Sequence, residues 1–300
     1  MVTPLAPQQL AGILPRQALR MVQDALQAAG CPDADYDARE LLRIAAGKDP
    51  RLLFVLLTRP QAECLAELAA QRMQRVPLQY LAGEWDFLGL TFKVGPGVLC
   101  PRADSEVVCE TAIELLQQMG KPEPRVLDLC AGSGCIGLAI ASQVPGARVV
   151  LGELDEGALR ICRQNIRRNS LSGQVVSLKM DALSGPPPRL GDFDCLVCNP
   201  PYIPSGDIAG LDVSVRDYEP HLALDGGTDG LDFYRSICRL WRDVLHTGSR
   251  LAFEVGIGQA DDVLRLMRGE GFGELEILPD PAGIPRVVTG LRYQEVYADA

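Results

Sequence analysis

The chain is poor in the residues that several functional classes require. Only 2 of its 300 residues are histidines, His221 and His246, and neither lies near a cysteine pair, so we expect no metal site. Uninterrupted apolar runs stay well below the roughly 18 residues of a membrane span. Basic residues are outnumbered, 29 against 39 acidic ones, and the net charge of −10 disfavours a broad nucleic-acid-binding surface.

We also expect no secretory signal, because the N-terminal MVTPLAPQQL lacks a basic region followed by an apolar run. The ten cysteines are therefore expected to be reduced, in a cytoplasmic protein. Cys195 and Cys198 form a C-x-x-C pattern, but they fall in FDCLVC, which is typical of a buried strand. Four arginines share one predicted helix and are expected to form a solvated helix face: Arg160, Arg163, Arg167 and Arg168.

The first quarter of the sequence has helical periodicity. Apolar residues at spacings of three and four predict helices at 14–29, 38–47 and 62–75, with a further helix near 51–57. The segment 84–94, EWDFLGLTFKV, has strand-forming residues on both sides of Gly89 and predicts a β-hairpin. We therefore expect a helical domain at 1–76 and a hairpin linker at 77–100.

Strands and helices alternate in the remainder, 101–300, after a first helix at 105–119. Continuous apolar strands that alternate with helices predict a doubly wound, mostly parallel α/β sheet covered on both faces. The last two strands follow each other without a helix, which indicates an antiparallel hairpin at one edge. The predicted strands are 125–130, 147–153, 174–180, 193–198, 250–255, 273–279 and 286–293, and the predicted helices between them are 135–143, 156–169, 230–245 and 259–269.

A glycine loop follows the first of these strands, in R-V-L-D-L-C-A-G-S-G. Gly132 and Gly134 permit a sharp turn and a close approach of the backbone to a ligand. Glu153 ends the next strand, where a carboxylate can accept hydrogen bonds from both ribose hydroxyls of an adenosine. Together the loop and the acid predict an adenosine-containing cofactor, although Glu153 alone would also be compatible with a solvated strand end.

The pattern D-x-x-x-G-x-G, which starts at Asp128, resembles the first motif of the class I S-adenosylmethionine-dependent methyltransferases rather than the G-x-G-x-x-G of dinucleotide-binding proteins. The first glycine position of that motif is Cys130 here. Because cysteine disfavours the left-handed region, we expect a negative φ at this position.

The tetrapeptide Asn199-Pro200-Pro201-Tyr202 follows a buried strand and should lie on the same rim as the glycine loop. A planar amide or base nitrogen is a weak nucleophile that must be positioned. The Asn199 side-chain oxygen and the Pro200 carbonyl can accept its N–H groups, and the Tyr202 ring can stack on its plane. The tetrapeptide therefore predicts methyl transfer to such a nitrogen, and the alternative is a turn in which Asn199 caps and Tyr202 packs.

Over nearly its whole length the sequence resembles the bacterial protein-(glutamine-N5) methyltransferases that modify peptide-chain release factors. The resemblance rests on five stretches: VPLQYLAGEWDFLGLTFKVGPGVLCPRADSE, VLDLCAGSGCIGLAIA, CNPPYIP, EPHLALDGGTDGLDFYRSI and DPAGIPRVV. It implies a helical domain that recognises the release factor, a hairpin linker and a seven-stranded catalytic domain. The implied substrate is the glutamine of the Gly-Gly-Gln loop of class-1 release factors, and the implied product of the cofactor is S-adenosylhomocysteine.

The resemblance also implies residue roles. The cofactor would be held by Asp128, Cys130, Ala131, Gly132, Ser133, Gly134, Glu153, Asp181, Ala182 and Asn199, and the glutamine by Asn199, Pro200, Pro201 and Tyr202. Some members have an aromatic residue at the position of Ala182. The stretch L-C-P-R-A-D-S-E departs from the commoner I-P-R-P-[DE]-T-E at Cys100, Ala103 and Ser105, and we expect Arg102 and Glu106 to form structural pairs.

Two other functions are compatible with parts of this pattern. An adenine or cytosine amino-methyltransferase shares the Asn-Pro-Pro-Tyr signature, but the acidic composition and the lack of a target-reading module argue against direct nucleic-acid binding. A non-catalytic adenosine-binding regulator would not need Asn199 and Tyr202. We expect a monomeric enzyme that acts on a protein and contacts no membrane.

Overall fold

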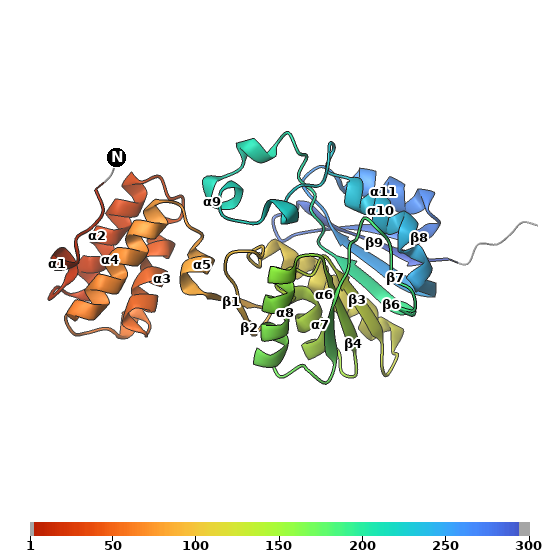
Figure 1. The fold of residues 1–300 in the computed structure, drawn as a ribbon, viewed down its shortest axis with the longest axis horizontal. Helices are drawn as coiled ribbons and strands as arrows, with labels where there is room; N and C mark the ends of the chain where they lie inside the picture. The colour runs from red at the N-terminus through yellow and green to blue at the C-terminus, as the bar shows by residue number, and fades with distance from the viewer. Residues whose placement is uncertain (1–2, 294–300) are drawn as a thin grey trace, which may run out of the picture. The chain divides into compact units, whose positions relative to one another are not determined.

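The computed structural model describes residues 3–293, so the last seven residues of the predicted catalytic domain lie outside the described part of the chain. The chain forms two compact units. The first contains residues 3–84 together with a returning segment, 212–218, and the second contains 85–211 and 219–293. Figure 1 shows the helices of the first unit and the sheet of the second.

The first unit is a small helical bundle. Its main helices, α2 (Pro15–Ala28), α3 (Ala34–Ala46) and α4 (Arg59–Met73), bury Leu26, Leu41 and Leu65 completely. Short helices precede and follow them: α1 (Pro7–Leu10), the 3₁₀ turn η1 (Pro50–Leu52) and α5 (Leu78–Ala82). The predicted helices at 14–29, 38–47 and 62–75 are confirmed.

The helix predicted near 51–57 is wrong. Only η1 forms there, and Phe54, Val55 and Leu56 are exposed on an irregular loop. The space between Pro50 and the N-cap of α4, Thr58, holds too few residues to form a stable helix without a buried face. An apolar run therefore gave a false helical signal.

The returning segment 212–218 belongs to the first unit, although it lies more than 120 residues downstream. It contains α9 (Val213–Arg216). The Arg75 guanidinium forms an ion pair with Asp212, and the Tyr218 hydroxyl donates a hydrogen bond of 2.8 Å to the Gln74 carbonyl. Nothing in the composition of this segment marks it as part of the helical bundle.

The second unit is built on a seven-stranded sheet in the order β5-β4-β3-β6-β7-β9-β8. The strands β3 to β7 are parallel, whereas β9 runs antiparallel to both β7 and β8. This confirms the predicted doubly wound sheet with an antiparallel edge hairpin. The strands are β3 (Arg125–Leu129), β4 (Arg148–Glu153), β5 (Val175–Lys179), β6 (Phe193–Cys198), β7 (Leu245–Glu254), β8 (Phe272–Pro279) and β9 (Pro285–Arg292).

Helices cover both faces of this sheet (Figure 1). One face packs against α6 (Asp104–Met119), α7 (Cys135–Gln143), α8 (Glu156–Arg168) and the hairpin β1 (Glu84–Phe87) and β2 (Leu90–Lys93). The other packs against α10 (Asp232–Leu240) and α11 (Ala260–Gly269). Three 3₁₀ turns complete the unit: η2 (Ile208–Gly210), η3 (His221–Ala223) and η4 (Arg242–Val244).

The C-x-x-C pattern and the arginine-rich helix are ordinary parts of the fold. Every residue of β6 is buried, including Cys195 and Cys198, and all ten cysteines are free. The four arginines on α8 are exposed, as expected for a solvated helix face. Within residues 3–293, no helix is long and apolar enough to cross a membrane.

A buried ion pair generates a test of the first unit. Asp37 and Arg72 are 2.7 Å apart with side chains only 4% and 8% exposed. Asp37→Ala would leave the guanidinium buried without its partner, at a cost of about 3–5 kcal/mol. Asp35→Ala, which breaks the exposed Asp35–Arg39 pair on the same helix, should cost less than about 1 kcal/mol.

Urea unfolding of the full chain measures this difference. Both tryptophans, Trp85 and Trp241, lie in the second unit, so their fluorescence reports that unit alone, whereas far-UV circular dichroism also reports the helical bundle. Asp37→Ala should shift the dichroism transition and leave the fluorescence transition in place. An equal free energy of unfolding for Asp37→Ala and Asp35→Ala would show that the buried Asp37–Arg72 pair does not stabilise the bundle.

Candidate functional site

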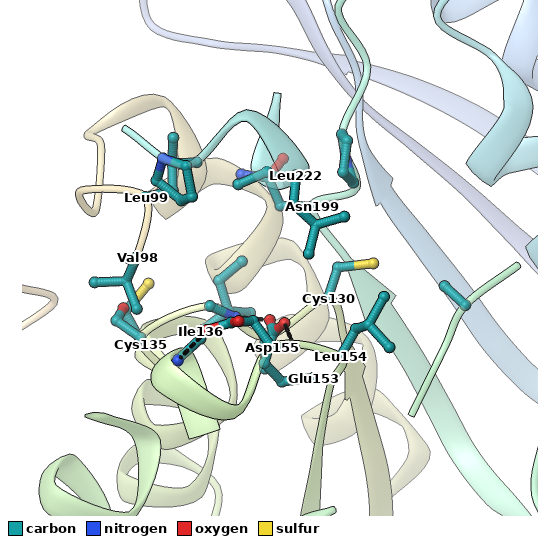
Figure 2. Close-up of a pocket in the computed structure, with 18 of the residues that line it drawn as sticks. Val98, Leu99, Cys130, Cys135, Ile136, Glu153, Leu154, Asp155, Asn199 and Leu222 are labelled. Carbon is teal, nitrogen blue, oxygen red and sulfur yellow. Dashed lines mark hydrogen bonds between the residues drawn. The ribbon is translucent and has the colours of Figure 1, made fainter. Parts of the chain in front are cut away.

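A cavity of about 200 Å³ opens at the carboxyl ends of the parallel strands in the second unit. Such a rim is the usual ligand site of an open α/β sheet. Figure 2 shows Glu153 and Asp155 on one side of the cavity and Asn199 and Leu222 on the other. Most of the lining comes from segments 97–101, 130–136, 153–155, 180–182 and 220–223, with Asn199, Pro201 and Phe233.

The glycine loop after β3 forms one wall. Gly132 and Gly134 have φ angles of 54° and 83°, and a Cβ added at Gly134 would lie 2.9 Å from the Leu151 side chain. A Cβ at Gly132 would meet no protein atom within 4 Å, which leaves its backbone accessible to a ligand. The loop leads into α7, whose first N–H groups can bind an anionic group.

The expected negative φ at Cys130 is wrong, because this residue has a φ of 63°. The turn from β3 into the loop requires the left-handed conformation whichever residue occupies the position. A non-glycine residue there stores backbone strain, which the packing of the surrounding loop must offset. The Cys130 side chain lies against the buried cluster that contains Cys198.

Asp128 lies behind the loop and is not among the residues that line the cavity. It is 1% exposed, and its Oδ2 accepts a hydrogen bond of 2.8 Å from the Gly137 N–H. Burial and, to a smaller extent, the like charge of Glu153 raise its pKa to about 7, against the lowering effect of the hydrogen bond from Gly137. Its carboxyl group thus fixes the start of α7 rather than facing the ligand space.

Glu153, at the end of β4, does line the cavity. Its two carboxylate oxygens accept hydrogen bonds of 2.8 Å from the N–H groups of Gly132 and Asp155, which fixes the orientation of the carboxylate. Burial raises its pKa above the ordinary value. Each oxygen retains a further lone pair, so this carboxylate can accept two ribose hydroxyls without moving.

The segment after β5 forms the opposite end of the cavity. Asp181 and Ala182 both line it, and Ala182 supplies no ring. The Ala182 carbonyl accepts hydrogen bonds of 2.8 Å from Ser236 Oγ and 2.9 Å from Trp241 Nε1. Phe233, on the same helix as Ser236, also lines the cavity, so α10 provides an aromatic side chain that our sequence analysis missed.

Asn199 follows β6 and faces the cavity from the strand end. Its Nδ2 donates a hydrogen bond of 3.0 Å to Ser105 Oγ, in the first turn of α6. Among residues 3–293 no group donates a hydrogen bond to the side-chain oxygen, Oδ1, which can therefore accept one from a ligand. Pro201 also lines the cavity, whereas Pro200 and Tyr202 do not.

Glycines hold the proline-rich turn in place. A Cβ at Gly226 would lie 2.8 Å from the Pro201 oxygen, and a Cβ at Gly230 would lie 2.3 Å from the Tyr202 oxygen. Gln259 Nε2 also donates to the Tyr202 carbonyl, at 2.8 Å. The D-G-G-T-D-G stretch is therefore required for close backbone packing against the tetrapeptide, a role that the sequence signals only through its glycines.

The phenol of Tyr202 is half-buried among charged groups. Burial and the nearby Glu254 carboxyl raise its pKa to about 12, against the opposing effects of Arg102 and Arg286. The hydroxyl is therefore neutral at physiological pH, which suits a ring that packs on a substrate rather than a general base.

Arg102 forms the structural pair that we expected. Its guanidinium lies 2.6 Å from the buried carboxylate of Glu219, which also accepts the N–H of Cys100 at 3.2 Å. This pair joins the two segments, 97–101 and 220–223, that form one mouth of the cavity. Glu106 makes no ion pair with any residue in the described part of the chain. Residues 3–293 contain no group of three or more His, Cys, Asp or Glu side chains arranged to hold a metal.

Comparisons with known proteins place this site in context. Residues 90–212 match the family model described as Methyltransferase small domain, and residues 17–83 match the PrmC N-terminal domain. The Release factor glutamine methyltransferase of Geobacter sulfurreducens is 42% identical over 281 residues, which cover 92% of this chain and 95% of that protein. The protein of the same name from Bradyrhizobium diazoefficiens is 36% identical and covers 96% and 98%.

Among solved structures, the T. thermophilus 16S rRNA N2 G1207 methyltransferase in complex with AdoMet and guanosine aligns with a TM-score of 0.50. The alignment covers 70% of this chain and 49% of that chain, at 23% identity. At this identity the likeness shows that the two proteins share a fold.

The packing around the tetrapeptide gives a second prediction. Gly230→Ala should destabilise the second unit by more than about 1 kcal/mol, because φ is 75° and the new methyl group would collide with the Tyr202 backbone. The matched control is Gly206→Ala in the same connection, where a Cβ meets nothing within 4 Å. Thermal unfolding should show a loss of at least about 2 °C for the first variant only. An equal melting temperature for both would argue against the packing role.

Proposed function

The chain belongs to the family of release factor glutamine methyltransferases, and from this premise we propose that it methylates the side-chain amide nitrogen (N5) of the glutamine in the Gly-Gly-Gln motif of class-1 peptide-chain release factors. The methyl donor is S-adenosylmethionine. The observation that supports this proposal most directly is the free Oδ1 of Asn199 at a cavity that also contains the glycine loop and Glu153.

The residues of the cavity fit this donor. Glu153 would accept the ribose hydroxyls, the open backbone at Gly132 with Cys130, Ala131 and Ser133 would face the amino-acid portion, and Asp181, Ala182 and Phe233 would enclose the adenine. Gly134, which does not line the cavity, would act only by allowing the turn into α7. Asp128 would act indirectly, through the position of α7. The bound donor supplies an electrophilic methyl group on a sulfonium.

The tetrapeptide would position the nucleophile. Asn199 Oδ1 and the Pro200 carbonyl would accept the two N–H groups of the glutamine amide, so that positive charge developing on the nitrogen is stabilised. Pro200 and Pro201 restrict the backbone, which keeps these acceptors in place. Tyr202, neutral at physiological pH, would pack on the amide plane.

The helical first unit would recognise the release factor, and we propose that the monomer acts in the cytoplasm without direct contact to nucleic acid. Incubation with isotopically labelled S-adenosylmethionine and either a release factor or nucleic acid tests the substrate. Mass spectrometry should show one added methyl group on the glutamine of Gly-Gly-Gln, and none when that glutamine is replaced. Transfer of label to nucleic acid alone would overturn the proposal in favour of a nucleic-acid amino-methyltransferase.

Cofactor affinity provides a third prediction. Glu153→Gln removes the charged acceptor from the cavity and should weaken binding of S-adenosylmethionine about tenfold or more, measured by calorimetry. Glu156→Gln, an exposed position on the adjacent helix, should bind as tightly as the wild type. Wild-type affinity in Glu153→Gln would exclude the ribose role.

Asn199 of the tetrapeptide gives a prediction about the rate of methyl transfer. Asn199→Ala removes an acceptor for the substrate amide and should lower the rate of methyl transfer about 100-fold or more, while most of the affinity for the cofactor remains. Single-turnover transfer to a release factor, at saturating cofactor, measures this loss. An undiminished rate would contradict the proposed mechanism.

A further inference from the structure

A buried carboxyl group lies beside the proposed site without being part of the cavity. Glu254, at the end of β7, is 2% exposed, and its Oε2 has no hydrogen-bond partner in the described part of the chain. Burial of an ionisable group without full pairing is costly, so such a group calls for an explanation. No motif in the sequence marks Glu254 as a functional residue.

The sheet register explains why Glu254 lies next to Asn199. Cys198 on β6 pairs with Phe253 on the parallel strand β7, and both face the side of α10 and α11. Because side chains alternate along strands, the next residues, Asn199 and Glu254, face the side of α6. Ser105 lies in the first turn of α6, only 4% exposed.

Ser105 connects the two side chains. Its Oγ accepts a hydrogen bond from Asn199 Nδ2 at 3.0 Å. The same hydroxyl lowers the pKa of the Glu254 carboxyl, so its dipole acts on that carboxyl and favours the ionised form. A hydroxyl has one proton to donate. When Glu254 is ionised it can only accept, so its charge draws the Ser105 proton toward it, and the Ser105 oxygen then accepts from the NH₂ group of Asn199.

We propose that Glu254, acting through Ser105, sets the orientation of the Asn199 amide so that its oxygen, and not its NH₂ group, faces the glutamine nitrogen. Glu254 and Ser105 are thus positioning residues for the methyl transfer inferred above, and their role rests on that proposed function. The reversed amide would present a donor to the N–H groups of the substrate and would repel them.

Protonation of Glu254 removes this control. A protonated carboxyl can donate to Ser105, which frees the Ser105 proton to point at Asn199 and allows the reversed amide. Burial raises the pKa of Glu254 to about 7, with Asp104 raising it and Arg286 and Arg102 lowering it. The group is therefore ionised above this pH, and correct orientation is lost as the pH falls through it.

Other groups surround this carboxyl and bear on its titration. They come from every neighbouring element: Asp104 from α6, Arg102 before it, Arg286 from β9, Tyr202 after β6, Cys135 from α7, Cys198 from β6 and Tyr234 from α10. Arg286 is held by ion pairs of 2.9 Å to Asp104 and 3.2 Å to Asp280. Because Asp128 also has a pKa of about 7, the wild-type profile alone does not identify Glu254.

The test therefore compares pH profiles of variants at saturating S-adenosylmethionine, with a release factor as substrate. The wild-type kcat should rise with pH through about 7. Glu254→Gln cannot ionise and can bind Ser105 in either orientation, so its kcat should be about tenfold lower at pH 8, and the rise attributable to Glu254 should disappear. Cofactor affinity at pH 8 should match that of the wild type.

Ser105 variants provide an independent measurement. Ser105→Ala should lower kcat about tenfold, and Ser105→Thr, which keeps the hydroxyl, should restore most of it. Ser249→Ala is the matched control, since it removes an equally buried hydroxyl from the far end of β7, where Ser249 donates to the Phe193 carbonyl. It should leave kcat unchanged.

The outcomes separate this inference from the proposed function. If the wild type transfers no methyl group to a release factor, the proposed function fails. If the wild type is active but Glu254→Gln keeps its full kcat and its pH dependence, the orientation role is overturned. Should Glu254→Gln fail to fold, full activity in Ser105→Ala would overturn it equally.

Discussion

The direction and register of the central strands determine where every functional group of this protein can lie. The strands β4, β3, β6 and β7 lie side by side in this order and are parallel, so their carboxyl ends meet at one edge of the sheet. A glycine loop follows β3, the Glu153 carboxylate ends β4, the Asn199 amide follows β6, and the buried Glu254 carboxyl ends β7. A shift of one of these side chains by a single position along its strand would turn it to the opposite layer of helices, because side chains alternate along a strand.

Rigid support of these strand ends comes from groups that do not face the ligand. The buried Asp128 holds the start of α7, and Gly226 and Gly230 allow the backbone to pack against Pro201 and Tyr202. A site that positions a weak nucleophile depends on such support, since small displacements of an acceptor cost much of the rate. The site therefore depends on glycines and on a buried carboxyl group as well as on the residues that line the cavity.

Much of this arrangement could be predicted from the sequence. The alternation of strands and helices gave the layered sheet, and the two motifs at strand ends placed Gly132, Glu153 and Asn199 on one rim, where the structure brings them together. These predictions worked because they rest on local periodicity and on the geometry common to parallel sheets.

The features that sequence analysis missed depend on contacts between distant segments. The φ of Cys130 is imposed by the turn against its residue preference, and the apolar run at 51–57 lacks a partner surface. The membership of 212–218 in the helical unit rests on Arg75 and Tyr218, and the importance of Glu254 appears only when Ser105 and Asn199 are seen beside it. Residue type and spacing alone contain no signal for such contacts.

The orientation of the Asn199 side chain is central to the whole account. A crystal structure of the protein with S-adenosylhomocysteine and a glutamine-containing release factor tests it most directly. We expect the glutamine amide nitrogen within hydrogen-bond distance of Asn199 Oδ1 and the Pro200 carbonyl, with Asn199 Nδ2 still bonded to Ser105. A glutamine side chain bound elsewhere, or an Asn199 amide whose NH₂ group faces the substrate nitrogen, would contradict the account.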